Sequence, residues 1–181
     1  MEKLNLGGQY MSTPQDSPEL ARFMMYFKPS TLGEIRVLSR MLNIAMVDFV
    51  AASMEAYIFA REYEMGSPVP IRDNERFIGP RSELTGRRIR YVMRLNKDLV
   101  EKIRDIAYLD NRRFTNVCDD SLSDFINYTK EAKNFKNIWL SRSDVEAVRG
   151  RKGAKATQII AELLDSFKAG IMSRGAAVKT I

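Results

Sequence analysis

Residues 90–131, RYVMRLNKDLVEKIRDIAYLDNRRFTNVCDDSLSDFINYTKE, decide the fold of this chain. They open with an alternating run, which predicts a short strand because successive strand side chains point to opposite faces. One face would carry Arg90, Val92 and Arg94, and the other Tyr91, Met93 and Leu95. Apolar residues then recur at helical spacing from Leu99 to Ala107, with Asp98 in the first turn as a start signal.

A polar break at residues 111–113 separates this helix from a second one. Thr115 is the predicted N-cap of the second helix, since a threonine hydroxyl accepts a hydrogen bond from an early backbone amide. The apolar face of that helix consists of Cys118, Leu122, Phe125 and Ile126. The whole stretch therefore predicts a strand, a helix, a turn and a helix.

This order and spacing resembles the ribbon-helix-helix (MetJ/Arc-like) superfamily of DNA-binding proteins. The resemblance rests on the alternating basic strand at residues 90–95, the polar step Asn96, Lys97 and Asp98, and the basic turn before Thr115. It implies that two strands pair into an antiparallel ribbon that enters the major groove of DNA. That groove admits a two-stranded ribbon, and alternate side chains then reach base edges.

Residues 22–63 repeat the pattern 68 positions earlier, without a gap. The offset aligns Arg22 with Arg90 in the strand and Ile35 with Ile103 in the first helix. In the second helix it aligns Met54, Tyr57 and Ile58 with Leu122, Phe125 and Ile126. A single copy cannot bury its apolar face, so we expect the two copies to pair within one chain.

The predicted fold is mainly α with a short β ribbon, built from tandem ribbon-helix-helix repeats. The expected segments are a flexible arm at 1–20, repeat one at 21–63, a Gly/Pro-punctuated linker at 64–88, repeat two at 89–134 and a basic C-terminal module at 135–181.

The C-terminal module resembles a third, shortened copy. It has a candidate strand at 137–140, a short helix at 143–148 and an amphipathic helix preceded by Thr157, and residues 170–181 are expected to form a frayed tail. A helix-turn-helix and a plain docking hairpin stay open as alternatives for this module.

The composition excludes several kinds of chemistry. The chain has no histidine and one cysteine, which removes Ser-His-Asp and Cys-His catalysis and the usual zinc ligand sets. No glycine-rich phosphate loop is present, and no apolar run approaches the roughly twenty residues of a membrane span. We expect a cytoplasmic protein with no catalytic residue, cofactor or metal, in which Cys118 is a buried structural thiol.

An enzyme is the alternative from another class. Its best support is the group Asp119, Asp120 and Asp124 on one helix. Neighbouring residues on a helix diverge by about 100°, so Asp119 and Asp120 make a poor catalytic pair. A solvated acidic face is the expected interpretation.

The formal net charge of +6 is uneven along the chain. Residues 136–181 carry nine Lys or Arg and four Asp or Glu, whereas the preceding residues are nearly balanced. A basic module beside a balanced one favours nucleic acid as a partner, with a solvated basic surface as the alternative.

We expect DNA base contacts from the outward strand faces: Arg90, Val92 and Arg94 in repeat two, and Arg22, Met24 and Tyr26 in repeat one. Phosphate contacts are expected at two helix starts, where backbone amides and cations bind anions. These residues are Arg112, Arg113, Thr115 and Asn116, then Arg149, Arg151, Lys152, Lys155 and Thr157. Repeat two should make most of the contacts, because the turn at 43–46 has no cation and Asp48 follows it.

The leading hypothesis is a sequence-specific double-stranded DNA-binding protein, most simply a transcriptional regulator such as a repressor. Tandem copies also resemble accessory DNA-binding proteins of conjugative plasmids and regulators of viruses. An architectural or accessory factor that recruits another enzyme is therefore the second interpretation, and a protein–protein interaction module is the third. Because a third copy would lack a partner in the chain, we also expect a homodimer through residues 135–181.

Overall fold

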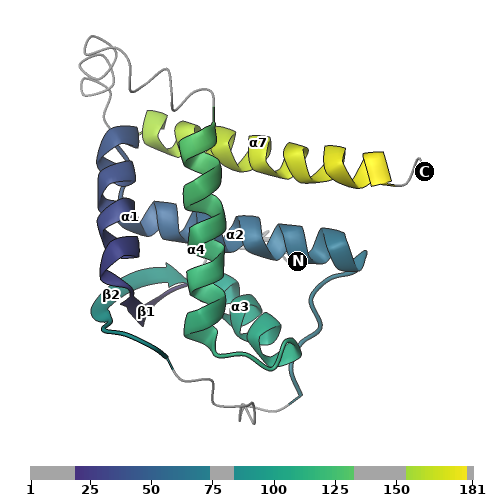
Figure 1. The fold of residues 1–181 in the computed structure, drawn as a ribbon, viewed down its shortest axis with the longest axis horizontal. Coiled ribbons are helices and arrows are strands. Elements are labelled where there is room, and N and C mark those ends of the chain that lie inside the picture. Colours follow the sequence, from purple (N-terminus) through teal and green to yellow (C-terminus); the bar gives the residue numbers. More distant parts are fainter. Residues whose placement is uncertain (1–18, 74–83, 133–153, 179–181) are drawn as a thin grey trace, which may run out of the picture.

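The computed structural model describes residues 19–73, 84–132 and 154–178. This part of the chain is mainly helical, with one two-stranded antiparallel sheet (Figure 1). The elements in chain order are β1 (Leu20–Phe27), α1 (Pro29–Leu42), α2 (Met46–Met65), β2 (Ile89–Asn96), α3 (Lys97–Leu109), α4 (Phe114–Glu131) and α7 (Ala154–Val178). No single helix among them is long and apolar enough to cross a membrane, although α1 and α2 pass that test as a pair bent by 106°.

The sheet joins two segments that are far apart in the sequence. β1 and β2 run antiparallel, with Met24 opposite Val92 near the middle. Side chains that face the helices, such as Met25 and Met93, are buried, and their neighbours on the outer face are exposed. The predicted strand at residues 90–95 is therefore confirmed, and the sheet has one face in the core and one in solvent.

Each strand leads directly into a pair of helices. α1 begins with Pro29, at a position where no backbone N–H is required. α3 is capped by the Asn96 side chain, which accepts a hydrogen bond of 2.8 Å from the Asp98 amide. Between the helices of each pair, Asn43 and Asn111 adopt left-handed backbone with φ of 54° and 55°, a conformation in which asparagine is enriched. The start signal predicted at Asp98 is confirmed.

The core is centred on the crossing of α2 and α4 (Figure 1). The Phe49 and Phe125 rings are fully buried there, with their centroids 5.2 Å apart. The predicted apolar face of α4 is confirmed as buried: Cys118, Leu122, Phe125 and Ile126. Burial raises the pKa of the Cys118 thiol, so this residue behaves as a small core side chain.

The segment after α2 is held against α3. α2 ends at Gly66, whose φ of 69° is left-handed backbone that glycine adopts without steric penalty. Arg72 then donates hydrogen bonds to Asp105 at 2.7 Å and to Glu101 at 2.5 Å. The start of the predicted linker is therefore part of the folded unit.

α7 lies across α2 and α4, on the side of the molecule away from the sheet (Figure 1). Its buried side chains are Leu163, Leu164 and Phe167. The Phe167 ring packs edge-on against Phe125 and Tyr128, with centroid distances of 6.0 and 5.1 Å. The C-terminal helix is thus part of the same core as the helices that follow the strands.

Two predictions about the C-terminal module are wrong. The helix expected to start after Thr157 starts at Ala154, so Thr157 lies inside α7 rather than at its N-cap. Residues 170–178, predicted as part of a frayed tail, continue the same helix. The candidate strand at 137–140 and the short helix at 143–148 lie outside the described residues.

The N-cap predicted at Thr115 is also wrong. α4 begins at Phe114, and Arg113 takes the cap position with extended backbone and no capping side chain. The Arg113 carbonyl accepts hydrogen bonds from the amides of Asn116 and Val117, at 3.0 and 3.2 Å. Because these bonds start the helical ladder at Arg113, Thr115 lies within the first turn.

Candidate nucleic-acid interface

The outer face of the sheet brings six predicted contact residues into one exposed layer. Across the two strands, Arg22 lies opposite Arg94, Met24 opposite Val92, and Tyr26 opposite Arg90. All six side chains are exposed. The structure thus assembles one surface from residues that the sequence places in two separate strands, and their contact with DNA stays a prediction.

The three arginines of this surface have no carboxylate partner among the described residues. Of the ten other described arginines, five form no ion pair either, and five pair with Asp or Glu: Arg61, Arg72, Arg88, Arg104 and Arg112. Arg22 and Arg94 are directly opposed across the strands, and like charges in that position destabilise a sheet. The stability of the fold does not explain this pair, whereas a bound anion would reduce the repulsion between the two arginines.

The centre of the same face is apolar. Met24 and Val92 are 45% and 53% exposed, large values for side chains that a folding core would bury. The Tyr26 hydroxyl donates to the Met24 sulfur at 3.0 Å, which holds the ring along the strand. The surface therefore combines an apolar centre with cations at both ends.

The start of α4 is the second predicted contact region. Arg113 is the N-cap residue and has no ion pair with any described residue. The Arg112 guanidinium donates a hydrogen bond of 2.6 Å to Asp120 in α4. This hydrogen bond raises the pKa of Arg112. Thr115 and Asn116 lie half-buried in the first turn.

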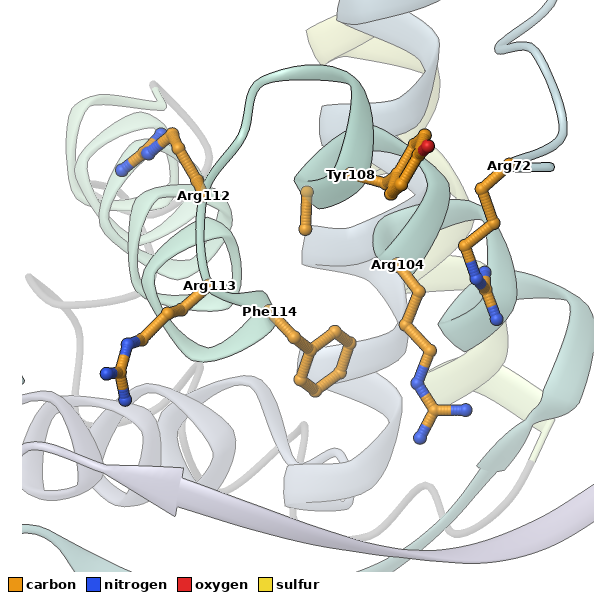
Figure 2. A pocket seen from close by; sticks show the side chains of 7 residues that line it. Arg72, Arg104, Tyr108, Arg112, Arg113 and Phe114 are labelled. Carbon is orange, nitrogen blue, oxygen red and sulfur yellow. The ribbon is translucent and has the colours of Figure 1, made fainter. Parts of the chain in front are cut away.

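A cavity of about 370 Å³ lies between α3 and the start of α4 (Figure 2). Its lining consists of Arg72, Arg104, Ala107, Tyr108, Arg112, Arg113 and Phe114. The Arg104 guanidinium lies 5.6 Å from the ring centroids of both Phe23 in β1 and Phe114 in α4. This cation between two rings fixes the start of α4 beside the Phe23 part of the ribbon.

The cavity is a poor site for a small anion, despite its four arginines. Arg72 and Arg104 both contact Glu101, and Arg112 contacts Asp120. Arg113 has no such partner, and Figure 2 shows its guanidinium pointing away from Arg104 and Arg72. Three of its four arginines are neutralised by carboxylates, and its walls include the packed side chains of Arg104 and Phe114.

The three aspartates of α4 do not form one acidic group. Asp119 is 8% exposed and accepts hydrogen bonds from Arg88 at 3.1 and 2.8 Å, whereas Asp120 faces Arg112. Burial, and then the charge of Asp120, raises the pKa of Asp124. The predicted solvated acidic face is therefore wrong for Asp119. No group of three potential metal ligands occurs in the described part of the chain.

The sequence reasoning missed the roles of Arg72, Arg88 and Arg104. Arg88 and Asp119 are 31 positions apart, so no local pattern marks their pairing. The contact between Glu101 and Arg104 has the i, i+3 spacing of a helix and is visible in the sequence. The stacking of Arg104 between two rings depends on the tertiary fold.

The basic cluster of the C-terminal module is described only in part. Arg149, Arg151 and Lys152 lie outside the described residues. For Lys155 and Thr157 the structure gives the helical backbone in the first turn of α7. Their predicted phosphate contacts stay predictions.

Comparison with known proteins gave no match to a family model, a curated protein sequence or a solved structure. What this chain binds must therefore be inferred from its own residues. The exposed face of the sheet and the start of α4 both carry arginines that form no ion pair with a described residue.

Proposed function

We propose that this protein binds double-stranded DNA sequence-specifically, by placing the β1–β2 ribbon in the major groove. The observation that carries the proposal is the outer ribbon face, with three exposed arginines that lack carboxylate partners. Two of them oppose each other at a cost to the sheet. Bound phosphate or a guanine edge would offset that cost.

The dimensions and chemistry of the ribbon suit the major groove. The groove is about 12 Å wide and admits a two-stranded ribbon. Arg22, Arg90 and Arg94 would donate bidentate hydrogen bonds to guanine, the commonest specific contact in that groove. Met24 and Val92 would contact thymine methyl groups, which are the apolar feature of the same edge.

Tandem ribbon-helix-helix copies are part of the proposal. Met24 and Val92 are 68 positions apart, and they are also paired across the sheet. The helix starts Pro29 and Lys97 differ by the same offset, as do Met46 and Phe114. One internal two-fold axis through the Met24–Val92 pair would relate all of these, which supports two copies forming one ribbon within a single chain.

The helix start at Arg113 supports a phosphate clamp beside the ribbon. Arg113 is a free cation next to the first amides of α4, and such helix starts bind anions. Arg112, Thr115 and Asn116 complete this predicted set. Arg149, Arg151, Lys152, Lys155 and Thr157 would add a second, sequence-independent set.

A transcriptional regulator and an architectural or accessory factor use the same groove chemistry, and both fit this proposal. A protein–protein interaction module is the candidate from another class, and the exposed Met24, Val92 and Tyr26 favour it. The two classes differ in their response to salt. DNA binding through basic contacts weakens steeply as salt rises, because condensed counterions are released on binding.

The test is fluorescence anisotropy of full-length protein with a random-sequence duplex, at several salt concentrations. We expect clear binding at low salt and a linear fall of log K with log salt. If no duplex binds at low salt, the DNA proposal is wrong and the interaction module is favoured.

A further inference from the structure

The two ends of the ribbon carry different side chains. At one end Arg22 faces Arg94, and at the other Tyr26 faces Arg90. Arg22 and Arg90 are 68 positions apart and identical, whereas Tyr26 and Arg94 are 68 positions apart and differ. The outer row is therefore not two-fold symmetric in its chemistry.

The starts of α2 and α4, which follow the two interhelix turns, also carry different side chains. The N-cap of α4 is Arg113, whereas the N-cap of α2 is Ala45. α2 also carries the exposed carboxylate of Asp48 in its first turn, where it would repel a phosphate. A phosphate clamp is therefore favoured at α4 and disfavoured at α2.

The start of α4 lies near the middle of β1. Arg104 lies 5.6 Å from the rings of Phe23 and Phe114, so the start of α4 adjoins the part of β1 that contains Phe23. Phe23 is the neighbour of Arg22, whose partner across the sheet is Arg94. Arg22 and Arg94 lie at one end of the ribbon, which we call the arginine end. Asp119, in the second turn of α4, contacts Arg88 and Lys28 at the other end, so Arg113 is not assigned to either end.

The opposite end is not without charge, but its cations are arranged differently. Arg87 and Arg90 are exposed there, while Lys28 and Arg88 share the carboxylate of Asp119, at 3.9 and 2.8 Å. The ends therefore differ in which groups face the groove rather than in total charge alone.

We propose that one chain binds a non-palindromic duplex site in a single orientation, with the arginine end on the more tightly contacted half. This inference rests on the DNA-binding function proposed above. A symmetric dimer presents the same side chains to both half-sites and so favours a palindrome. Here one chain supplies both strands of the ribbon, and its two ends contact the half-sites with different groups.

The experiment has two steps. Full-length protein first selects its preferred sequence from a random duplex pool. Single cysteines are then introduced by Lys97→Cys or Lys28→Cys, and each is labelled with iron–EDTA to cleave DNA locally. Lys97 adjoins the arginine end and Lys28 the opposite end, and both side chains are half-exposed. The native Cys118 is 3% exposed and does not compete for the label.

On a short duplex holding one selected site, we expect each conjugate to cleave one flank, and the two conjugates to cleave opposite flanks. The preference should be at least about tenfold, since the outer rows of the two ends differ by one base-contacting arginine. Adding Tyr26→Arg makes the arginines of the outer row symmetric, and it should lower that preference.

A palindromic consensus, with equal cleavage of both flanks by each conjugate, would overturn the orientation inference and leave DNA binding intact. Failure of the pool to yield any preferred sequence would overturn the sequence-specific function itself, and the inference with it. The two failures are therefore distinguishable.

Discussion

At the scale of single residues, the arginine pair across the ribbon is the most informative feature. Arg22 and Arg94 are opposed in the sheet without a carboxylate between them, although carboxylates serve five other arginines of the described chain. Cross-strand like charges oppose folding. A surface on which like charges lower the stability of the fold is typical of a binding site for a ligand of opposite charge.

Replacing Arg94 by threonine should separate stability from binding. Arg94→Thr is expected to raise the free energy of unfolding by up to about 1 kcal/mol without DNA, because it removes the repulsion from Arg22. The matched control is Arg90→Thr, since Arg90 faces Tyr26 rather than a cation. Urea denaturation at low and high salt measures both. An equal effect of the two variants would show that the repulsion is not significant.

The ion pair of Arg88 and Asp119 gives a second prediction at this scale. Both side chains are about one-tenth exposed, so Asp119→Ala leaves a buried guanidinium without its partner. Such a loss costs about 3–5 kcal/mol of folding free energy. Asp124→Ala, on the exposed side of the same helix, should cost far less. Urea unfolding midpoints compare the two, and similar losses would contradict the assignment.

At the scale of elements, most of the strand and helix pattern was predictable. The alternation at 90–95 and the spacing of Val100, Ile103 and Ile106 both follow burial in the structure. The start of α4 was not predictable from Thr115, because the Arg104 stack and the Arg113 carbonyl fix where the helix begins. Caps depend on tertiary contacts, whereas periodicity depends on which face is buried.

The contribution of α7 to the core is testable through its central aromatic residue. Phe167→Ala should lower the free energy of unfolding by about 3–5 kcal/mol, since it removes a ring packed between Phe125 and Tyr128. Met172→Ala is the control, because Met172 is 46% exposed on the same helix. Thermal or urea unfolding measures the free energy of unfolding of both variants. If both variants unfold like the parent protein, α7 is not part of the core.

At the scale of the whole molecule, the site was only partly predictable. The six outer residues of the ribbon follow from strand alternation, and all six share the exposed face. That Arg22 would face Arg94 rather than Arg90 required the register, which the sequence did not specify. The position of α7 against α2 and α4 was missed because a helix pattern does not state which neighbour covers its apolar side.

Assembly is a separate prediction for the whole molecule. The homodimer expected through residues 135–181 cannot use the apolar stripe of α7, because Leu163, Leu164 and Phe167 are buried within the chain. A dimer would have to form through the rest of that module. Light scattering of full-length protein without DNA should then give twice the 20.8 kDa of one chain. A mass of one chain at micromolar concentration would rule out the homodimer.

The central claim is that the outer ribbon face recognises base sequence, and one ratio tests it most directly. That ratio is the affinity for a selected duplex divided by the affinity for random duplex, measured for the parent protein and for Arg90→Ala combined with Arg94→Ala. We predict that the double variant stays folded by circular dichroism and loses about 1–3 kcal/mol of discrimination for each arginine. Arg174→Ala, on the exposed side of α7, should leave the ratio unchanged. A folded double variant that keeps the full ratio would contradict the claim.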